Sequence, residues 1–140
     1  MRIMAVDYGD AHTGVALSDP TGFLAGTTTT IHSRKTEVVL EELSKLVREY
    51  QVEELVMGFP KNMDGTEGPR AELYRAFADQ LSQATGLTPI LWDERRTTVD
   101  AHRILFDAGK NAKKRKKTVD AVAASLILEN YLDFKRLQSH

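Results

Sequence analysis

The sequence has 140 residues, a length typical of one domain, with 41% hydrophobic and 28% charged residues. This balance argues against wholesale disorder, and no apolar run approaches the roughly 20 residues that a membrane helix needs. Cysteine is absent, which excludes disulfides, thiolate metal sites and a cysteine nucleophile. We therefore expect a soluble, cytoplasmic protein with no membrane partner, in which residues 1–140 form a single domain.

The net charge of −1 conceals an uneven distribution of basic residues. Six of them crowd into eight positions: Lys110, Lys113, Lys114, Arg115, Lys116 and Lys117. Removing these six from the 19 basic residues leaves 13 against 20 acidic ones, so an acidic body carries one basic segment. Such a segment is either a solvated loop or an arm that contacts phosphates, because clustered Lys and Arg displace the counterions condensed on nucleic acid.

Three strands are expected at the start of the chain. Residues 2–7 are apolar on both alternations, as in a central strand that is covered on both faces. Residues 14–18 predict a second strand, and the threonine-rich residues 25–31 suit a half-exposed edge strand. Short turns separate the three segments, so we expect an antiparallel meander.

Helices and strands alternate after residue 33. An apolar stripe from Val39 to Tyr50 predicts a helix, and residues 55–59 predict a buried strand. A second helix is expected to begin at Pro69 and to end at Gly86, followed by a fifth strand over residues 88–93. The apolar stripe expected for the second helix is Leu73, Phe77, Leu81 and Ala84.

Two further helices complete the predicted order. The first starts at a capping pattern, Thr97 and Asp100, and is closed by Gly109. The second begins around Thr118, just after the basic segment, and carries its apolar stripe to Tyr131. The order predicts an α/β fold with a five-stranded mixed sheet, in which an antiparallel meander is joined by two strands parallel to the first. Helices are expected on both faces.

Acidic residues gather where such a sheet binds ligands, beyond the carboxyl ends of its parallel strands. Asp7 ends the first strand, Asp93 and Glu94 end the fifth, and Asp120 begins the last helix. Carboxylates on rigid elements suit Mg²⁺ or Mn²⁺, and two such ions about 4 Å apart can serve phosphodiester hydrolysis. Each acid alone has a structural explanation as a turn former, a surface charge or a helix-dipole partner, but their coincidence at one edge favours a metal site. The four histidines are scattered and none has i, i+4 metal spacing, so we do not expect a histidine zinc site.

Four segments in order carry a resemblance to a known family. They are Asp7-Tyr8-Gly9 with Gly14-Val15-Ala16, Gly58-Phe59-Pro60-Lys61-Asn62-Met63-Asp64-Gly65-Thr66-Glu67, Asp93-Glu94-Arg95-Arg96-Thr97-Thr98, and Lys117-Thr118-Val119-Asp120-Ala121-Val122-Ala123-Ala124. Together they resemble the YqgF family, also called RuvX. Its members are ribonuclease H-like proteins described as Holliday-junction-resolvase homologues and associated with maturation of the 5′ end of precursor 16S ribosomal RNA.

The resemblance implies a ribonuclease H-like sheet and a hydrolase that cleaves structured nucleic acid with Mg²⁺ or Mn²⁺. Asp7, Glu94 and Asp120 look like the catalytic and metal-binding triad, although strand parity leaves Asp93 open as the alternative to Glu94. The expected phosphate contacts are Arg95, Lys113, Lys114, Arg115, Lys116 and Lys117. The family generally has a basic residue in the turn after the first acid, where this chain has Ala11 and His12.

Two other interpretations keep a related fold. The first is a nucleic-acid-binding ribosome-assembly factor without catalysis, for which the basic segment matters and the acids do not. The second takes Asp7-Tyr8-Gly9 and Gly14 as the phosphate motif of actin-like ATPases and sugar kinases, which need two such domains where 140 residues supply one. A nuclease that cuts symmetric junctions would in addition require a homodimer.

Overall fold

The computed structural model describes residues 1–60, 67–93 and 112–138, with the backbone alone for residues 112–120. The strands are β1 (Arg2–Asp7), β2 (His12–Ser18), β3 (Ala25–His32), β4 (Val52–Phe59) and β5 (Ile90–Asp93). The helices are α1 (Thr36–Glu49), α2 (Pro69–Thr85) and α4 (Ala112–Gln138). The helix expected between Thr97 and Gly109 lies outside the described residues. In the described parts of the chain, no helix has the length and apolarity needed to cross a membrane.

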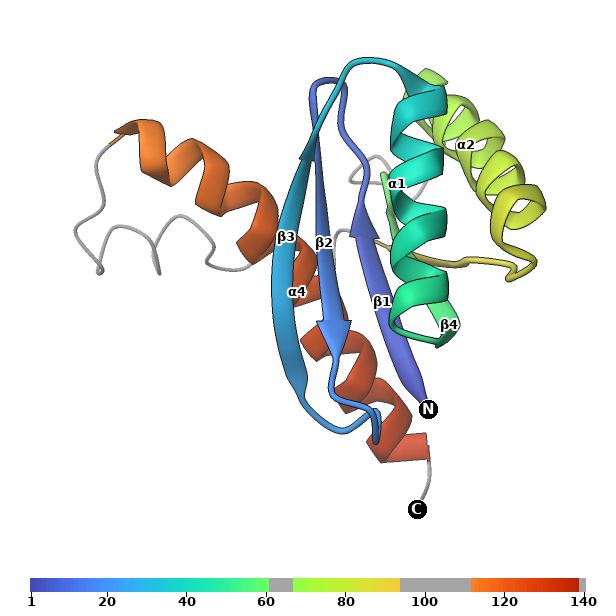
Figure 1. Ribbon diagram of the computed structural model, residues 1–140, viewed down its shortest axis with the longest axis vertical. Helices are drawn as coiled ribbons and strands as arrows, with labels where there is room; N and C mark the ends of the chain where they lie inside the picture. Colours follow the sequence, from blue (N-terminus) through green and yellow to red (C-terminus); the bar gives the residue numbers. More distant parts are fainter. Residues whose placement is uncertain (61–66, 94–111, 139–140) are drawn as a thin grey trace.

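The five strands form one mixed sheet in the order β3-β2-β1-β4-β5 (Figure 1). β1 pairs antiparallel with β2, and β2 pairs antiparallel with β3. β4 is parallel to β1 and β5 is parallel to β4. The predicted meander and both predicted parallel pairings are confirmed.

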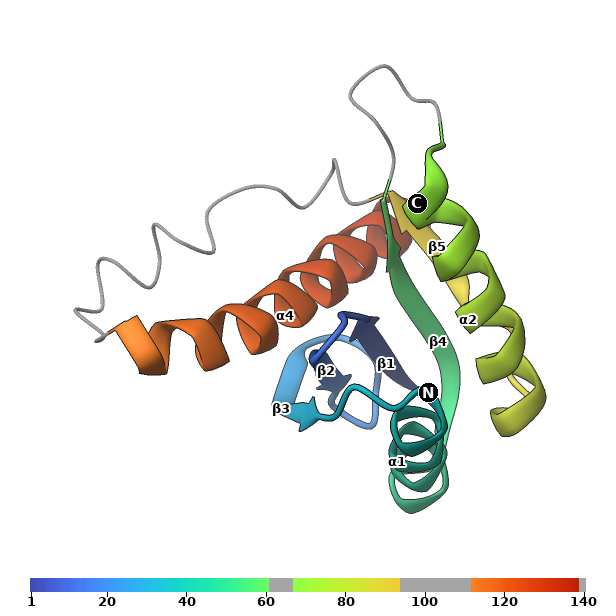
Figure 2. The ribbon, with the colours of Figure 1, turned by 90° about the horizontal axis from the view of Figure 1, so that it is seen from above.

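Helices cover both faces of the sheet (Figure 2). One face packs with α1 and α2, and its buried cluster includes Met4, Val6 and Leu43. The other face packs with α4, and its buried cluster includes Ile3 and Ala5. The central strand β1 is therefore covered on both sides, as its two apolar alternations predict.

The buried stripe of α2 differs from the predicted one. The residues that α2 buries are Ala71, Tyr74, Phe77, Ala78 and Leu81. Leu73 is 52% exposed, and Ala84 is exposed as well, so these two predicted core positions are wrong. The observed buried face includes Tyr74, whose hydroxyl donates a hydrogen bond of 2.6 Å to the Tyr8 carbonyl. The polar group of Tyr74 is thereby satisfied while its ring packs in the core.

The last helix begins earlier than the sequence pattern predicts. α4 starts at Ala112 instead of around Thr118, so the basic residues 113–117 lie within its first turns. This segment is rich in Lys, Arg and Ala, which favour helix, and no Gly or Pro interrupts residues 112–138. The interpretation of the basic run as a loop before the helix is corrected for residues 113–117, and Lys110 lies outside the described residues. β2 and β4 also begin two and three residues earlier than predicted, and β5 two residues later.

The loop between β2 and β3 is organised by the Asp19 carboxylate. It accepts hydrogen bonds from the Thr21 hydroxyl and from the backbone N–H groups of Phe23 and Leu24, at 2.9 and 3.0 Å for the two amides. These bonds favour the ionised form, the Thr21 hydroxyl most, and they lower the pKa of Asp19 from 3.8 to about 2.

We expect Asp19→Asn to reduce stability at neutral pH and to have a smaller effect in acid. Because the folded-state pKa lies below the unfolded value, the ionised carboxylate favours folding above about pH 4, and this contribution is lost as pH falls towards 2. Urea unfolding of both proteins between pH 6 and pH 2 measures the difference in the free energy of unfolding. A difference that stays constant over this range would contradict the assignment.

Candidate active site

Asp7 is the last residue of the central strand. It is half-buried and lies opposite Gly14 of β2 in the antiparallel pairing. The turn that follows is tight, because a Cβ atom on Gly9 would lie 2.4 Å from the carbonyl oxygen of His12. Glycine at position 9 therefore allows β2 to return directly beside the Asp7 carboxylate.

The carboxyl ends of the three parallel strands lie together at this edge of the sheet. Val6 of β1 pairs with Met57 of β4, and Phe59 of β4 pairs with Asp93 of β5. Phe59 is fully buried and belongs to the core, as expected. Asp7 and Asp93 thus end two strands of one edge, with β4 between them.

Asp7 and Asp93 face opposite sides of the sheet. Ile3 and Ala5 pack with α4, so strand alternation puts Asp7 on the α4 face. Trp92 also packs with α4, whereas Leu91 packs with the cluster on the other face. The same alternation therefore puts Asp93 on the face of α1 and α2, away from Asp7.

Tyr8 fixes the chain immediately after Asp7. Its ring stacks on Phe77 at a centroid separation of 3.8 Å and an interplanar angle of 10°. Tyr74 meets the same ring edge-on at 5.4 Å and donates its hydroxyl to the Tyr8 carbonyl. Tyr8 is thereby held on the α1 and α2 face, which directs the preceding residue, Asp7, towards α4.

Helix α4, which packs on the Asp7 face of the sheet, carries position 120 and the basic residues on its N-terminal turns. Ala124 of this helix is fully buried against the strands, and Asp120 lies four residues before it. Residues 113–117 occupy the first turns of α4, and this end of the helix extends past the β3 edge (Figures 1 and 2). The backbone thus places residue 120 and the basic turns on one continuous element.

Part of the predicted site lies outside the described residues. Glu94 and Arg95 follow β5 directly but are not described, and the side chains of residues 112–120 are not described either. Among the described side chains, no group of three His, Asp or Glu residues is close enough to hold one metal ion. Of the predicted triad, the structure therefore gives the surroundings of the Asp7 side chain alone.

A pair of histidines that the sequence pattern separates is brought together here. His12 begins β2 and His32 ends β3, and the two are register partners. Their Nδ1 atoms are 2.8 Å apart. Spacing along the chain, which is 20 residues, gives no sign of this contact; only the predicted meander with its register could have found it.

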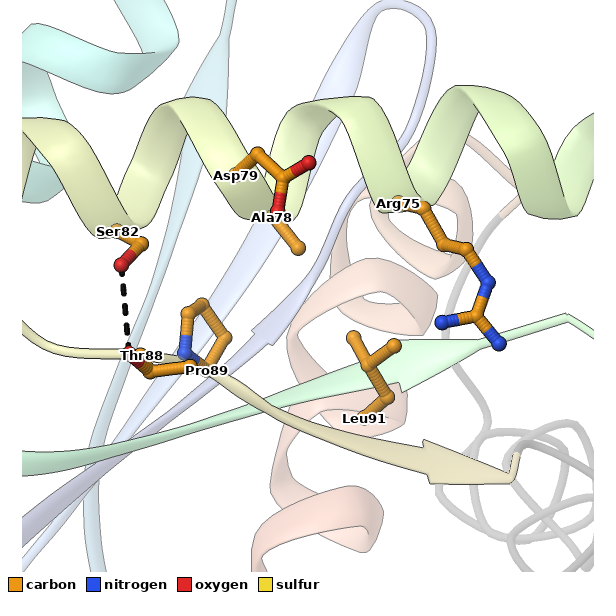
Figure 3. A pocket seen from close by; sticks show the side chains of 7 residues that line it. All are labelled: Arg75, Ala78, Asp79, Ser82, Thr88, Pro89 and Leu91. Atoms are coloured by element: carbon orange, nitrogen blue, oxygen red, sulfur yellow. Dashed lines mark hydrogen bonds between the residues drawn. The ribbon is translucent and has the colours of Figure 1, made fainter.

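A cavity of about 430 Å³ lies on the opposite face from Asp7, between α2 and β5 (Figure 3). Arg75, Asp79 and Ser82 of α2 contribute to one wall, and Thr88, Pro89 and Leu91 form the other. The Arg75 guanidinium is already engaged, since it forms a 2.8 Å ion pair with Glu67 and lies 4.7 Å from the Phe59 ring centroid. Because the cavity lies on the face of α1 and α2, it is separate from Asp7 on the α4 face.

The strand order, the parallel and antiparallel pairings and the acid at the end of the central strand define a ribonuclease H-like fold. A solved structure agrees: the Thermus thermophilus RuvC in complex with a Holliday junction substrate has a TM-score of 0.62 to this chain. It covers 98% of this chain and 96% of RuvC at 11% sequence identity, so the likeness concerns the fold.

The chain belongs to the RuvX family, described as Holliday junction resolvase, whose model matches residues 1–134. A relative from Moorella thermoacetica, named "Putative pre-16S rRNA nuclease", is 50% identical over 133 residues, which are 95% of this chain and 95% of the relative. A relative of the same name from Carboxydothermus hydrogenoformans is 44% identical over 135 residues, 96% of this chain and 98% of that protein. The resemblance noted from the four motifs is confirmed.

Proposed function

We propose that this chain is a divalent-metal-dependent nuclease that hydrolyses phosphodiester bonds in structured nucleic acid. Its substrate class would be precursor 16S rRNA at the 5′ end, branched DNA of the Holliday-junction kind, or both. The observation that carries the proposal is the half-buried Asp7 carboxylate at the end of the central strand, on the face of the sheet that α4 covers. Position 120 and the basic residues 113–117 lie on that same helix. The family description and the names of the relatives support the same activity.

The proposed metal ligands are Asp7, Glu94 and Asp120. Glu94 is preferred to Asp93 because strand alternation puts Asp93 on the face opposite to Asp7. Asp120 is included because helical spacing aligns position 120 with Ala124, Ile127 and Leu128, which α4 buries against the sheet.

This donor set fits a hard cation. Carboxylate oxygens at rigid strand and helix positions are the ligands that Mg²⁺ and Mn²⁺ prefer. Asp7 pairs with Gly14 of β2, and the preceding Val6 pairs with Met57 of β4. When bound, a pair of such ions would supply orientation of an attacking water and stabilisation of the leaving oxygen. The two-ion arrangement is part of the proposal.

The basic residues would hold the substrate against the acidic edge. Carboxylates alone repel a polyanion, so cationic side chains must lie beside them. The proposed phosphate contacts are Arg95, next to Glu94, and Lys113, Lys114, Arg115, Lys116 and Lys117 on α4.

The activity is tested by incubating the protein with precursor 16S rRNA fragments and with four-way DNA junctions, each with Mg²⁺, with Mn²⁺ and with EDTA. We expect cleavage of at least one substrate with metal and none with EDTA. Cleavage that persists in EDTA would overturn the metal requirement. Mapping the ends of the products would show which substrate is cut at defined positions.

A second candidate function rests on the basic helix. Residues 113–117 place five cationic positions along the first turns of α4, which would bind nucleic acid without any cleavage. On this interpretation the chain is a ribosome-assembly factor with the same fold. Tight, salt-sensitive binding by a protein that cleaves neither substrate would favour it over the nuclease.

Replacing Lys113, Lys114 and Arg115 by Gln should weaken binding to both RNA and DNA and flatten its salt dependence. Each lost phosphate contact lowers the slope of log K against log salt by about 0.7 to 0.9, so three contacts lower it by roughly 2 to 3. Fluorescence anisotropy at several salt concentrations measures the slope. The matched control replaces Lys35, Lys45 and Arg48 of the α1 region, and an equal loss there would argue against a specific role for α4.

We also propose that cleavage of a symmetric junction requires a homodimer, because two strands must be cut by equivalent sites. Sedimentation of the protein with and without a junction would detect it.

A further inference from the structure

His12 and His32 face each other across two hydrogen-bonded strands. Their Nδ1 atoms are 2.8 Å apart, and their rings meet edge-on with centroids 4.9 Å apart at an angle of 81°. The strand pair is closed just beyond them by a 3.0 Å hydrogen bond from the Ser33 N–H to the Ala11 carbonyl. The two imidazoles are therefore held together by the sheet backbone before any ligand arrives.

We propose that His12 and His32 form a binding site for a late first-row transition-metal cation of the Zn²⁺ class. Two nitrogens bound to one tetrahedral Zn²⁺ at 2.0–2.1 Å stand roughly 3.3 Å apart. The Nδ1 atoms already lie within about half an ångström of that separation. A small opening of the two rings places both nitrogens at coordination distance from one ion.

The proton shared between the two Nδ1 atoms can move to Nε2 of the donor ring when a cation binds. The present hydrogen bond needs one ring protonated at Nδ1, whereas metal binding needs both Nδ1 lone pairs. The donor ring can carry its proton on Nε2 instead, so a neutral pair binds the cation without changing its own charge.

The chemistry of the pair selects a cation different from the one proposed for the nuclease site. Imidazole nitrogen favours Zn²⁺, Cu²⁺ and Ni²⁺, whereas Mg²⁺ takes oxygen ligands. Among the described side chains, the pair is not part of a group of three metal-ligating residues, so the described part of the chain supplies two nitrogen ligands to the ion. His32 is exposed and His12 is half-exposed, so a cation can reach both rings from solvent.

The two sites would occupy the same edge and face of the sheet. Residue 12 shares the parity of Ala16, which packs with α4, and Asp7 shares the parity of Ala5. Zinc binding by the histidines needs neither substrate nor catalysis, so it stands or fails independently of the proposed nuclease activity.

The test is calorimetric titration of ZnCl₂ into the protein in the presence of millimolar Mg²⁺, which occupies oxygen-rich sites. Wild type is compared with His12→Gln, His32→Gln and the control His140→Gln. We expect either substitution in the pair to weaken zinc binding by roughly tenfold or more, and the control to leave it unchanged. Circular dichroism establishes that each variant remains folded.

A second measurement uses the unmodified protein. Nitrogen-15 NMR of the imidazoles should show zinc shifting the Nδ1 signals of His12 and His32 together, while Mg²⁺ leaves them in place. Unchanged zinc affinity in either folded variant of the pair would overturn the proposal. So would Nδ1 signals that do not respond to zinc, even where a variant fails to fold.

Discussion

Asp7→Asn should lower metal-dependent cleavage at least about a hundredfold while the protein stays folded. Asparagine keeps the size of the side chain and one oxygen, but it removes the negative charge that a divalent cation requires. Metal ions supply several kcal/mol to such reactions, and each 1.4 kcal/mol is about tenfold in rate. Single-turnover cleavage of a precursor rRNA fragment and of a four-way junction measures the loss.

Asp10→Asn is the matched control for this substitution. Asp10 is an exposed carboxylate in the turn only three residues after Asp7. We expect its variant to cleave within about twofold of wild type, because an exposed charge near a strand end has a small and salt-screened influence. Equal cleavage by the Asp7 variant and wild type would remove Asp7 from the mechanism. Equal losses in both variants would indicate a general charge effect.

Phe77→Ala should cost about 3–5 kcal/mol in the free energy of unfolding. The Phe77 side chain is 2% exposed and lies in the cluster between the sheet and α1 and α2. The substitution removes its apolar contacts, leaves a cavity and eliminates the stacking on Tyr8 at 3.8 Å. Urea or thermal unfolding, with the midpoint and slope both fitted, measures the change.

Leu73→Ala on the same helix separates the observed α2 stripe from the predicted one. Leu73 is 52% exposed, so we expect a loss within about 0.5 kcal/mol. A loss of unfolding free energy for Leu73→Ala as large as that for Phe77→Ala would indicate that α2 buries the stripe expected from the sequence. That result would contradict the hydrogen bond from Tyr74 to the Tyr8 carbonyl.

The sheet was largely predictable, because its signals are local and strong. Residues 2–7 are apolar on both alternations, and that pattern has few solutions other than a central strand. Apolar spacing alone did not decide which face α2 buries, because Tyr74, Phe77, Ala78 and Leu81 also form an i, i+3, i+4, i+7 stripe. The hydrogen bond from Tyr74 to the Tyr8 carbonyl, 66 positions away in the chain, belongs to the observed face, and spacing along the helix does not reveal it. Likewise, lysines and arginines are common both in exposed helices and in solvated loops, so the start of α4 at Ala112 could not be located from composition.

For the candidate site, sequence and structure contribute different parts. The position of Asp7 follows from the predicted strand alone. The proposed preference for Glu94 over Asp93 rests on the observed burial of Trp92, because neighbouring strand residues face opposite sides. The contact between His12 and His32 depends on an exact register between two strands, and a shift of one residue would have placed one of the rings on the opposite face.

The pairing of β1 with β4 also bears on when the site can form during synthesis. The meander of β1, β2 and β3 can close early because its contacts are local, but the other edge of β1 must wait for residues 52–59. The face that carries Asp7 stays uncovered until α4, which ends at Gln138, has left the ribosome and docked. A nascent chain would thus carry Asp7 for most of its translation before the proposed metal site could assemble.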